Sequence, residues 1–195
     1  MQYSLRLCAG IDRVIGVIAG IGASAGVVLI LVTVWDVVTR YLGVPRGFGI
    51  NATELQESEA WLHTFLFSMV IGYAYLRQSH VRIDLIRDHL RSRKKYLIEI
   101  IGCAVFVIPY CCVAGYYTFF FAQKAYQTGE ISSSSVGLTN VWIMKSFLLA
   151  MFVLLGLAGV SQLIKATAGF MGKLPAALVP LTIGGDLEIT TDAGD

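Results

Sequence analysis

The stretch VIGVIAGIGASAGVVLILVTVW, residues 14–35, decides the class of this protein, because it contains no charged side chain from end to end. A helix needs about 20 mostly apolar residues to cross the roughly 30 Å hydrocarbon layer of a membrane. The whole chain has the same character, with 56% hydrophobic and 14% charged residues, whereas an ordinary soluble domain carries about 25% charged residues. The composition therefore predicts an integral membrane protein.

The front of this stretch has features of a secretory signal. Arg6 and Arg13 precede it, and the small residues ASA lie inside it. The apolar run continues through GVVLILVTVW, well past the point where a signal peptide would be cleaved. We therefore expect the segment to be retained as a membrane anchor.

Three further segments are candidates for membrane-crossing helices, namely residues 53–77, 96–121 and 141–164. Residues 53–77 are the least apolar, with Glu54, Glu57 and Glu59 near the start, where the helix dipole favours negative charge. Thr53 and Gln56 predict a capping box at that start. The expected fold is an all-α integral membrane protein with four transmembrane helices in residues 1–165, followed by a partly disordered tail in residues 166–195.

The distribution of basic residues predicts the orientation, because positively charged connections remain in the cytoplasm. Of the fifteen Lys and Arg residues, two precede the first helix, seven lie in RQSHVRIDLIRDHLRSRKK (residues 77–95) and two, Lys165 and Lys173, follow the last expected span, which leaves four for the opposite side. Both termini are therefore expected to be cytoplasmic. The tryptophans agree, because Trp35, Trp61 and Trp142 all fall at the opposite face, and indole rings favour the membrane interface.

Two interpretations of the basic segment remain open. It sets the orientation and contacts anionic lipid head groups, or it forms a docking surface for a partner. Net charge at neutral pH is only +2, which disfavours a nucleic-acid-binding protein. The candidate contact residues on this side are Arg77, His80, Arg82, Asp84, Arg87, Arg91, Arg93, Lys94 and Lys95.

Ionisable side chains inside the expected helices are few and lie near the helix ends. Asp36 and Arg40 are four residues apart and are expected to pair on one helix face. Lys145 either extends its ammonium to the interface or pairs with Asp36 or Glu57 inside the protein.

The sequence predicts no catalytic, cofactor or metal site, and no enzyme activity. His63 is the one histidine inside an expected span, and haem held by two histidines needs a second one. The cysteines show no spacing typical of zinc or iron–sulfur sites. No expected span carries a series of acidic residues and histidines that could relay protons.

Four stretches resemble the DctQ-type small membrane subunit of tripartite ATP-independent periplasmic (TRAP) transporters. They are WDVVTRYLGVP (residues 35–45), TELQESEAWLHTFLF (53–67), HVRIDL (80–85) and GL followed by WIMKS (137–146). The resemblance covers roughly residues 10–165. It implies a bacterial inner-membrane complex in which a periplasmic binding protein captures a small, usually carboxylate-bearing solute and a large multi-span subunit imports it with sodium. The small subunit then serves as a scaffold.

In such a complex, the periplasmic side would contact the partners. The candidate residues there are Asp36, Arg40, Glu54, Glu57, Glu59, Trp61 and Lys145, and residues 130–140 are expected to contribute to binding-protein docking. The basic segment would contact lipid or the cytoplasmic edge of the large subunit. Two alternatives stay open: a haem-bearing or haem-free four-helix anchor of a respiratory enzyme, and a small exporter that acts as an oligomer.

Overall fold

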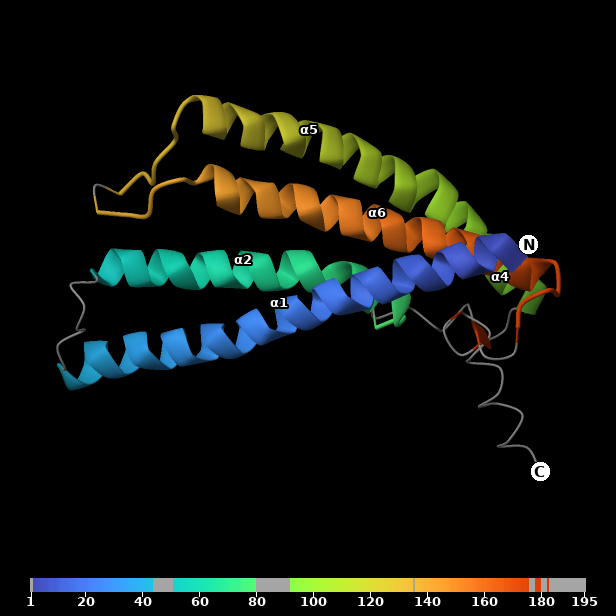
Figure 1. The fold of residues 1–195 in the computed structure, drawn as a ribbon, viewed down its shortest axis with the longest axis horizontal. Coiled ribbons are helices and arrows are strands. Elements are labelled where there is room, and N and C mark those ends of the chain that lie inside the picture. The colour runs from blue at the N-terminus through green and yellow to red at the C-terminus, as the bar shows by residue number, and fades with distance from the viewer. Residues whose placement is uncertain are drawn as a thin grey trace. The chain divides into compact units, whose positions relative to one another are not determined.

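The computed structural model describes residues 2–43, 51–79, 92–134, 136–175, 178–179 and 182. Within these ranges the chain is helical and contains no strand, which confirms the all-α prediction for the described part. The elements are α1 (Gln2–Leu42), α2 (Ala52–Leu76), α4 (Ser92–Ile101), the π-helix η1 (Gly102–Val107), α5 (Ile108–Gln127) and α6 (Trp142–Phe170), as Figure 1 shows. Helices α4, η1 and α5 follow one another without a break.

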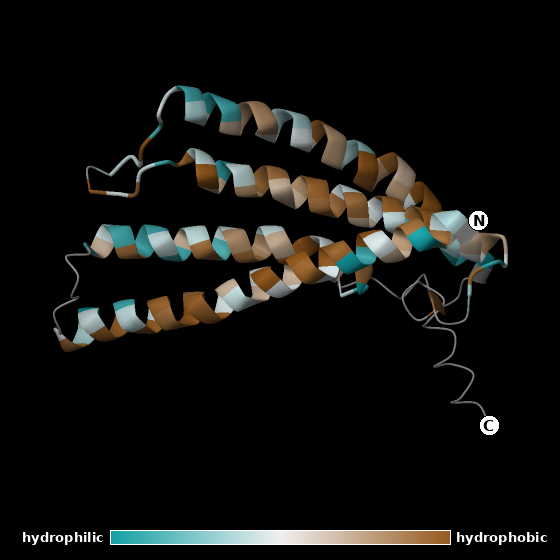
Figure 2. Cartoon of the chain, in the orientation of Figure 1, coloured by the Kyte–Doolittle hydropathy of each residue, from teal (hydrophilic) through white to brown (hydrophobic). Residues whose placement is uncertain are grey.

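Three of the described helices are long and apolar enough to cross a membrane: Tyr3–Leu42, Arg93–Gln127 and Trp142–Phe170. Helix α2 forms where a fourth span was predicted and has 25 residues. Its first turns are hydrophilic (Figure 2), and Glu59 and His63 lower its hydropathy further. Three of the four predicted spans are therefore supported, and the crossing of α2 remains a prediction.

The start of α2 differs from the predicted capping box of Thr53 and Gln56. The Glu54 carboxylate instead accepts a hydrogen bond from the Asn51 backbone N–H at 2.9 Å. This contact satisfies a donor that an α-helix leaves unpaired at its first turn. The prediction was wrong by two residues because Thr53 and Asn51 are both good capping residues, and only the path of the chain chooses between them.

The π-helix η1 ends at Val107, two residues before Pro109. The Ile108 N–H bonds to the Cys103 carbonyl, five residues back, where an α-helix would bond four residues back. Proline has no N–H and its ring collides with the carbonyl four residues before it. The wider π register is a common response inside long helices.

The chain divides into two compact units, which share the long helices between them. The first unit comprises residues 1–16, 72–113 and 154–195, and the second comprises residues 17–71 and 114–153. Most of the predicted tail, residues 166–195, lies outside the described residues, although α6 itself continues to Phe170.

A buried ion pair joins α1 to α6 in the first unit. The Lys165 ammonium is 2.5 Å from an oxygen of Asp12, and its side chain is only 1% exposed. The other Asp12 oxygen accepts a hydrogen bond from the Ser161 hydroxyl at 2.6 Å. Cys8, on the turn before Asp12, is fully buried and donates its thiol hydrogen to the Ser161 carbonyl at 3.7 Å.

Helix α2 joins this cluster through its last residue. The Gln162 side-chain amide donates a hydrogen bond of 3.1 Å to the Leu76 carbonyl, which is among the orphan carbonyls of the helix end. Gly72 lies close to the α6 backbone, since a Cβ atom placed on it would be 2.9 Å from the Leu154 carbonyl oxygen. In membranes, helices associate by packing closely at small residues. Burial of apolar side chains does not drive their association there, because the lipid tails are equally apolar.

The second unit packs by the same principle. A Cβ atom on Gly22 would lie 2.6 Å from the Met69 Cβ, so glycine at this position lets α1 approach α2 closely. Between α2 and α6, the rings of Phe65 and Phe147 meet edge to face with centroids 5.0 Å apart. These contacts bring the start of α2 next to the connection between α5 and α6, where the candidate site lies.

Candidate functional site

Glu57 fastens the connection between α5 and α6 to the start of α2. Its carboxylate accepts a hydrogen bond from the Ser132 hydroxyl through Oε1 and another from the Leu138 backbone N–H, at 2.6 Å, through Oε2. Both donors lie in the connection, 75 and 81 residues further along the chain. These hydrogen bonds favour the ionised form of the Glu57 carboxylate.

Gly137 makes this arrangement sterically possible. A Cβ atom at this position would lie 2.5 Å from Glu57 Oε1 and 2.5 Å from Ser132 Cβ. Two backbone hydrogen bonds close the same loop, from the Ser132 N–H to the Leu138 carbonyl and from the Val141 N–H to the Glu130 carbonyl. The connection is therefore an ordered loop held by its own hydrogen bonds.

Lys145 of α6 forms a further contact with the connection between α5 and α6. Its ammonium is 2.6 Å from the Glu130 carboxylate and 3.8 Å from the centre of the Phe121 ring. The Lys145 side chain is 9% exposed, so it does not extend to solvent. The predicted partners, Asp36 and Glu57, are therefore wrong. The partner is Glu130, because the connection folds back over the first turn of α6.

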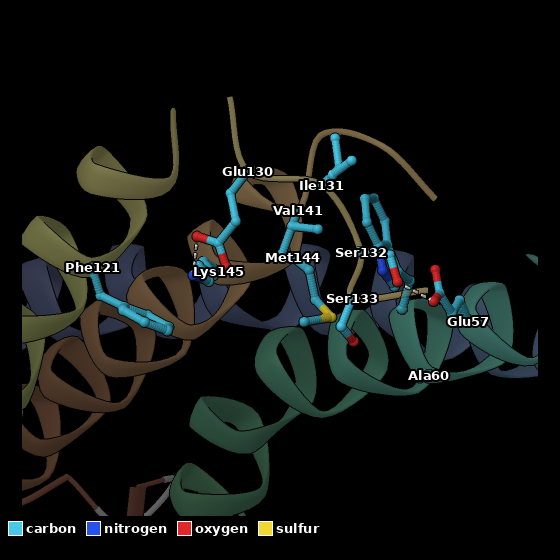
Figure 3. Close-up of a pocket in the computed structure, with 11 residues that line it drawn as sticks. Glu57, Ala60, Phe121, Glu130, Ile131, Ser132, Ser133, Val141, Met144 and Lys145 are labelled. Atoms are coloured by element: carbon cyan, nitrogen blue, oxygen red, sulfur yellow. Dashed lines mark hydrogen bonds and ion pairs between the residues drawn. The ribbon is translucent and has the colours of Figure 1, made fainter. Parts of the chain in front are cut away.

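A pocket of about 570 Å³ opens among these groups (Figure 3). Ile131 and Ser133 of the connection lie over it, and the Lys145–Glu130 pair and the Ser132–Glu57 hydrogen bond lie on either side. The remaining lining residues are Ala60, Trp61, Phe121, Val141 and Met144. Its three charged side chains each have a partner in the chain: Lys145 pairs with Glu130, and Glu57 accepts two hydrogen bonds from the connection.

A second polar group lies where α1 and α2 face each other near the end of α1. Asp36 is 4% exposed and pairs with Arg40 on the next turn, as predicted. With its amide oxygen turned toward Arg40, Gln56 accepts from both terminal guanidinium nitrogens, at 3.2 and 2.6 Å. Glu59 lies near this pair, since Asp36 and Arg40 are the two charges that act on it. One oxygen each of Asp36 and Glu59 is buried without a hydrogen-bond partner.

The family model for the DctQ component of tripartite ATP-independent periplasmic transporters matches residues 29–169. The match covers more than half of the chain and includes both polar groups described above. The chain belongs to the DctQ family. No curated protein and no solved structure matches it.

A DctQ-family chain is the small membrane component of a three-part transporter, which also contains a large membrane subunit and a binding protein. The family is a transporter component and not an enzyme family. The resemblance seen in the sequence is therefore confirmed. The matched region ends at residue 169, next to the end of α6 at Phe170.

The structure places the predicted periplasmic residues of this DctQ-family chain in separate groups. Glu57, Trp61 and Lys145 line the pocket, whereas Asp36, Arg40 and Glu59 form the group between α1 and α2. Glu54 accepts the capping hydrogen bond from the Asn51 N–H at the start of α2. All seven residues lie in the second unit, as do the other two tryptophans, Trp35 and Trp142.

Four of the predicted basic-side residues lie in the described part. Arg77 is exposed and donates a hydrogen bond of 2.9 Å from Nε to the Tyr73 hydroxyl. Arg93 is exposed over the Phe170 ring, and Lys94 is exposed as well. Lys95 is only 6% exposed, because it lies on the inward face of α4. Contact with lipid requires an exposed side chain, so Lys95 does not fit the predicted role. The others, His80, Arg82, Asp84, Arg87 and Arg91, lie outside the described residues.

The sequence reasoning missed the residues that secure the connection between α5 and α6. Ser132 and Gly137 lie in residues 130–140, which the sequence indicates only as a docking segment, and the sequence prediction does not pair Glu130 with Lys145. A usable signal was present, because a lysine one turn inside an apolar helix requires a negative partner. The nearest acidic residue outside that helix is Glu130, 15 residues away in the chain.

Replacing Glu57 by glutamine should release this connection from α2. A neutral amide accepts hydrogen bonds less strongly than a carboxylate, so we expect both hydrogen bonds from the connection to weaken. Hydrogen exchange of amides in residues 130–140 should become faster, with little change elsewhere. Glu54→Gln is the matched control, since glutamine also serves at that capping position. Equal exchange in the two variants would contradict the role assigned to Glu57.

Proposed function

We propose that this chain is the scaffold subunit of a sodium-coupled TRAP transporter in a bacterial inner membrane. In this proposal, α2 crosses the membrane together with the three apolar helices, and both termini lie in the cytoplasm. The imported solute is small and carries a carboxylate. The large subunit moves it, while this chain holds that subunit in place and helps to dock the binding protein.

The family match over residues 29–169 carries this proposal. The charged side chains of the described helices support a scaffold, because Asp12, Lys145 and Lys165 are used to connect parts of the same chain. Among the described residues no group of three or more histidine, cysteine, aspartate or glutamate side chains could hold a metal ion. The respiratory-anchor alternative is not favoured by the family to which the chain belongs.

Co-purification tests the proposal directly. A tagged chain, expressed with the proteins encoded beside it and extracted in mild detergent, should bring down one much larger multi-span protein. The sample should show no Soret absorption band. A haem spectrum would support the respiratory anchor, and a homo-oligomer without a large partner would support the exporter.

The connection between α5 and α6 is the surface that we assign to binding-protein docking. It presents Ile131, 64% exposed, and Val136, 47% exposed, on a loop that is fastened at both ends. Apolar side chains on a preorganised loop bind a partner with little ordering cost. Glu57 serves this surface by positioning the loop and not by touching the partner, and this changes the role predicted for it.

Replacing Ile131 by aspartate should weaken docking while leaving assembly intact. We expect solute uptake by proteoliposomes to fall by about tenfold or more at limiting binding protein, since a central contact residue is worth about 1–2 kcal/mol or more. Co-purification with the large subunit should be unchanged. Thr139→Asp adds the same charge at another exposed position of the loop and is the control. Equal loss in both variants would indicate charge repulsion and would count against an apolar contact at Ile131.

A further inference from the structure

The group formed by Asp36, Arg40, Gln56 and Glu59 has two buried carboxylate oxygens that form no hydrogen bond with the described part of the chain. Asp36 uses Oδ2 for Arg40, while its Oδ1 is buried without a hydrogen-bond partner. The Asp36 side chain is 6% exposed, so this oxygen is not compensated by open water. Glu59 Oε1 is also buried without a hydrogen-bond partner.

The charges of this group do not balance. Asp36 and Glu59 contribute two negative charges and Arg40 contributes one positive charge. Arg40 is already engaged with Asp36 and, through its terminal nitrogens, with Gln56. The isolated chain therefore holds one uncompensated carboxylate charge at the junction of α1 and α2. Carboxylates removed from water are ordinarily paired or hydrogen-bonded, because desolvation without a partner is costly.

Glu59 is the member that a partner can reach. Its side chain is half-buried, and among the described residues it forms no hydrogen bond. The neighbouring Ala60 is exposed on the same helix. On α1, the adjoining surface is apolar and exposed, with Trp35 at 46% and Val37 at 47%. The carboxylate thus lies at the edge of an apolar face, and the one described cation beside it, Arg40, is already paired with Asp36.

We propose that Glu59, backed by Asp36, receives a guanidinium or ammonium side chain of the large transporter subunit. The inference rests on the proposed function and adds the surface and the charge of the partner group. A cation placed against the half-buried Glu59 side chain balances the second carboxylate charge of the group. Apolar contacts of α1 around it then exclude water and strengthen the ion pair.

Arg40 and Gln56 prepare this site. The ion pair with Arg40 holds Asp36 in one position, and Gln56 in turn holds the guanidinium. Asp36 is therefore a positioning residue and Glu59 is the residue that makes the contact. The negative charge that this arrangement leaves at Glu59 favours an incoming arginine or lysine over a neutral side chain.

The test compares assembly with the stability of the isolated chain. Glu59→Gln should weaken binding of the large subunit by at least about tenfold in a titration by fluorescence in detergent, because the partner cation loses its counter-charge. The melting temperature of the isolated variant should be equal or higher, since an unpaired carboxylate has been removed. Glu59→Asp should retain more binding than Glu59→Gln, and Glu54→Gln is the control with normal binding.

Each contrary outcome is distinct. Unchanged binding of Glu59→Gln beside a wild-type chain that does bind would overturn this inference and leave the proposed function standing. A lower melting temperature of the isolated variant would show that the carboxylate acts inside the chain, and would also overturn it. If a small cation, and not a side chain of the large subunit, binds at Glu59, then binding of the large subunit to the wild-type chain should fall when choline replaces sodium. That result would also overturn this inference. Failure of the wild-type chain to bind any large subunit would instead overturn the proposed function.

Discussion

Asp12→Ala should destabilise this protein more than any other single truncation considered for the described residues. The substitution leaves the Lys165 ammonium without its counter-charge, and this side chain is only 1% exposed. Breaking a buried ion pair from one side costs about 3–5 kcal/mol, because the remaining charge stays desolvated. The Ser161 hydroxyl also loses its acceptor. We expect a large fall in melting temperature and in the yield of monodisperse protein in detergent.

A double variant separates the ion pair from simple loss of packing. Asp12→Leu combined with Lys165→Met replaces both charges by apolar groups of similar size, a change that is often neutral for buried pairs. The double variant should recover most of the stability lost in Asp12→Ala. Arg13→Ala, which removes an exposed charge from the next position of α1, should be nearly neutral. A double variant as unstable as Asp12→Ala would show that the charges are not the cause.

Gly72→Ala should force α2 away from α6. The added Cβ would lie 2.9 Å from the Leu154 carbonyl oxygen and 3.1 Å from its carbonyl carbon. Both are backbone atoms, so the collision can be relieved only by moving a helix and not by rotating a side chain. Overpacking of this kind costs about 1–3 kcal/mol. Thermal unfolding in detergent should report the loss, together with weaker protection of amides near Leu76 and Gln162.

The matched control for this prediction is Gly20→Ala. Gly20 is also in a helix interior, but a Cβ atom there meets nothing within 4 Å. Alanine has the higher helix propensity, by roughly 1 kcal/mol in a helix interior, so this variant should be as stable as the wild type or more stable. Comparable destabilisation by both substitutions would mean that glycine flexibility, and not the contact with Leu154, is needed at position 72.

The helices and the family could be predicted because both depend on local sequence. Apolar runs long enough to cross a membrane mark α1, the continuous helix from α4 through η1 to α5, and α6, whatever they pack against. The Asp36–Arg40 pair was predicted for the same reason, since residues four apart share one helix face. The crossing of α2 was harder to judge, because the polar groups that lower its hydropathy are satisfied by other parts of the fold, as Glu57 shows.

Pairing between distant segments could not be predicted in this way. Lys145 was assigned to Asp36 or Glu57, whereas the fold brings Glu130 to it and gives Glu57 to Ser132 and Leu138. The sequence indicates that Lys145 needs an acidic partner, but proximity along the chain does not establish which acidic side chain the fold brings to it. The choice depends on the path of residues 128–141 over the start of α6.

The sequence by itself determined that this is a helical membrane protein of the DctQ family, because hydropathy and motif order are properties of short segments. The tertiary structure alone decided which charges meet, above all Asp12 with Lys165, 153 residues apart. An ion pair inside an apolar protein is stable only when both groups arrive at one point with their other hydrogen bonds satisfied. That point is set by how each helix is rotated and how closely its glycines allow a neighbour to approach, and neither property can be read from one segment alone.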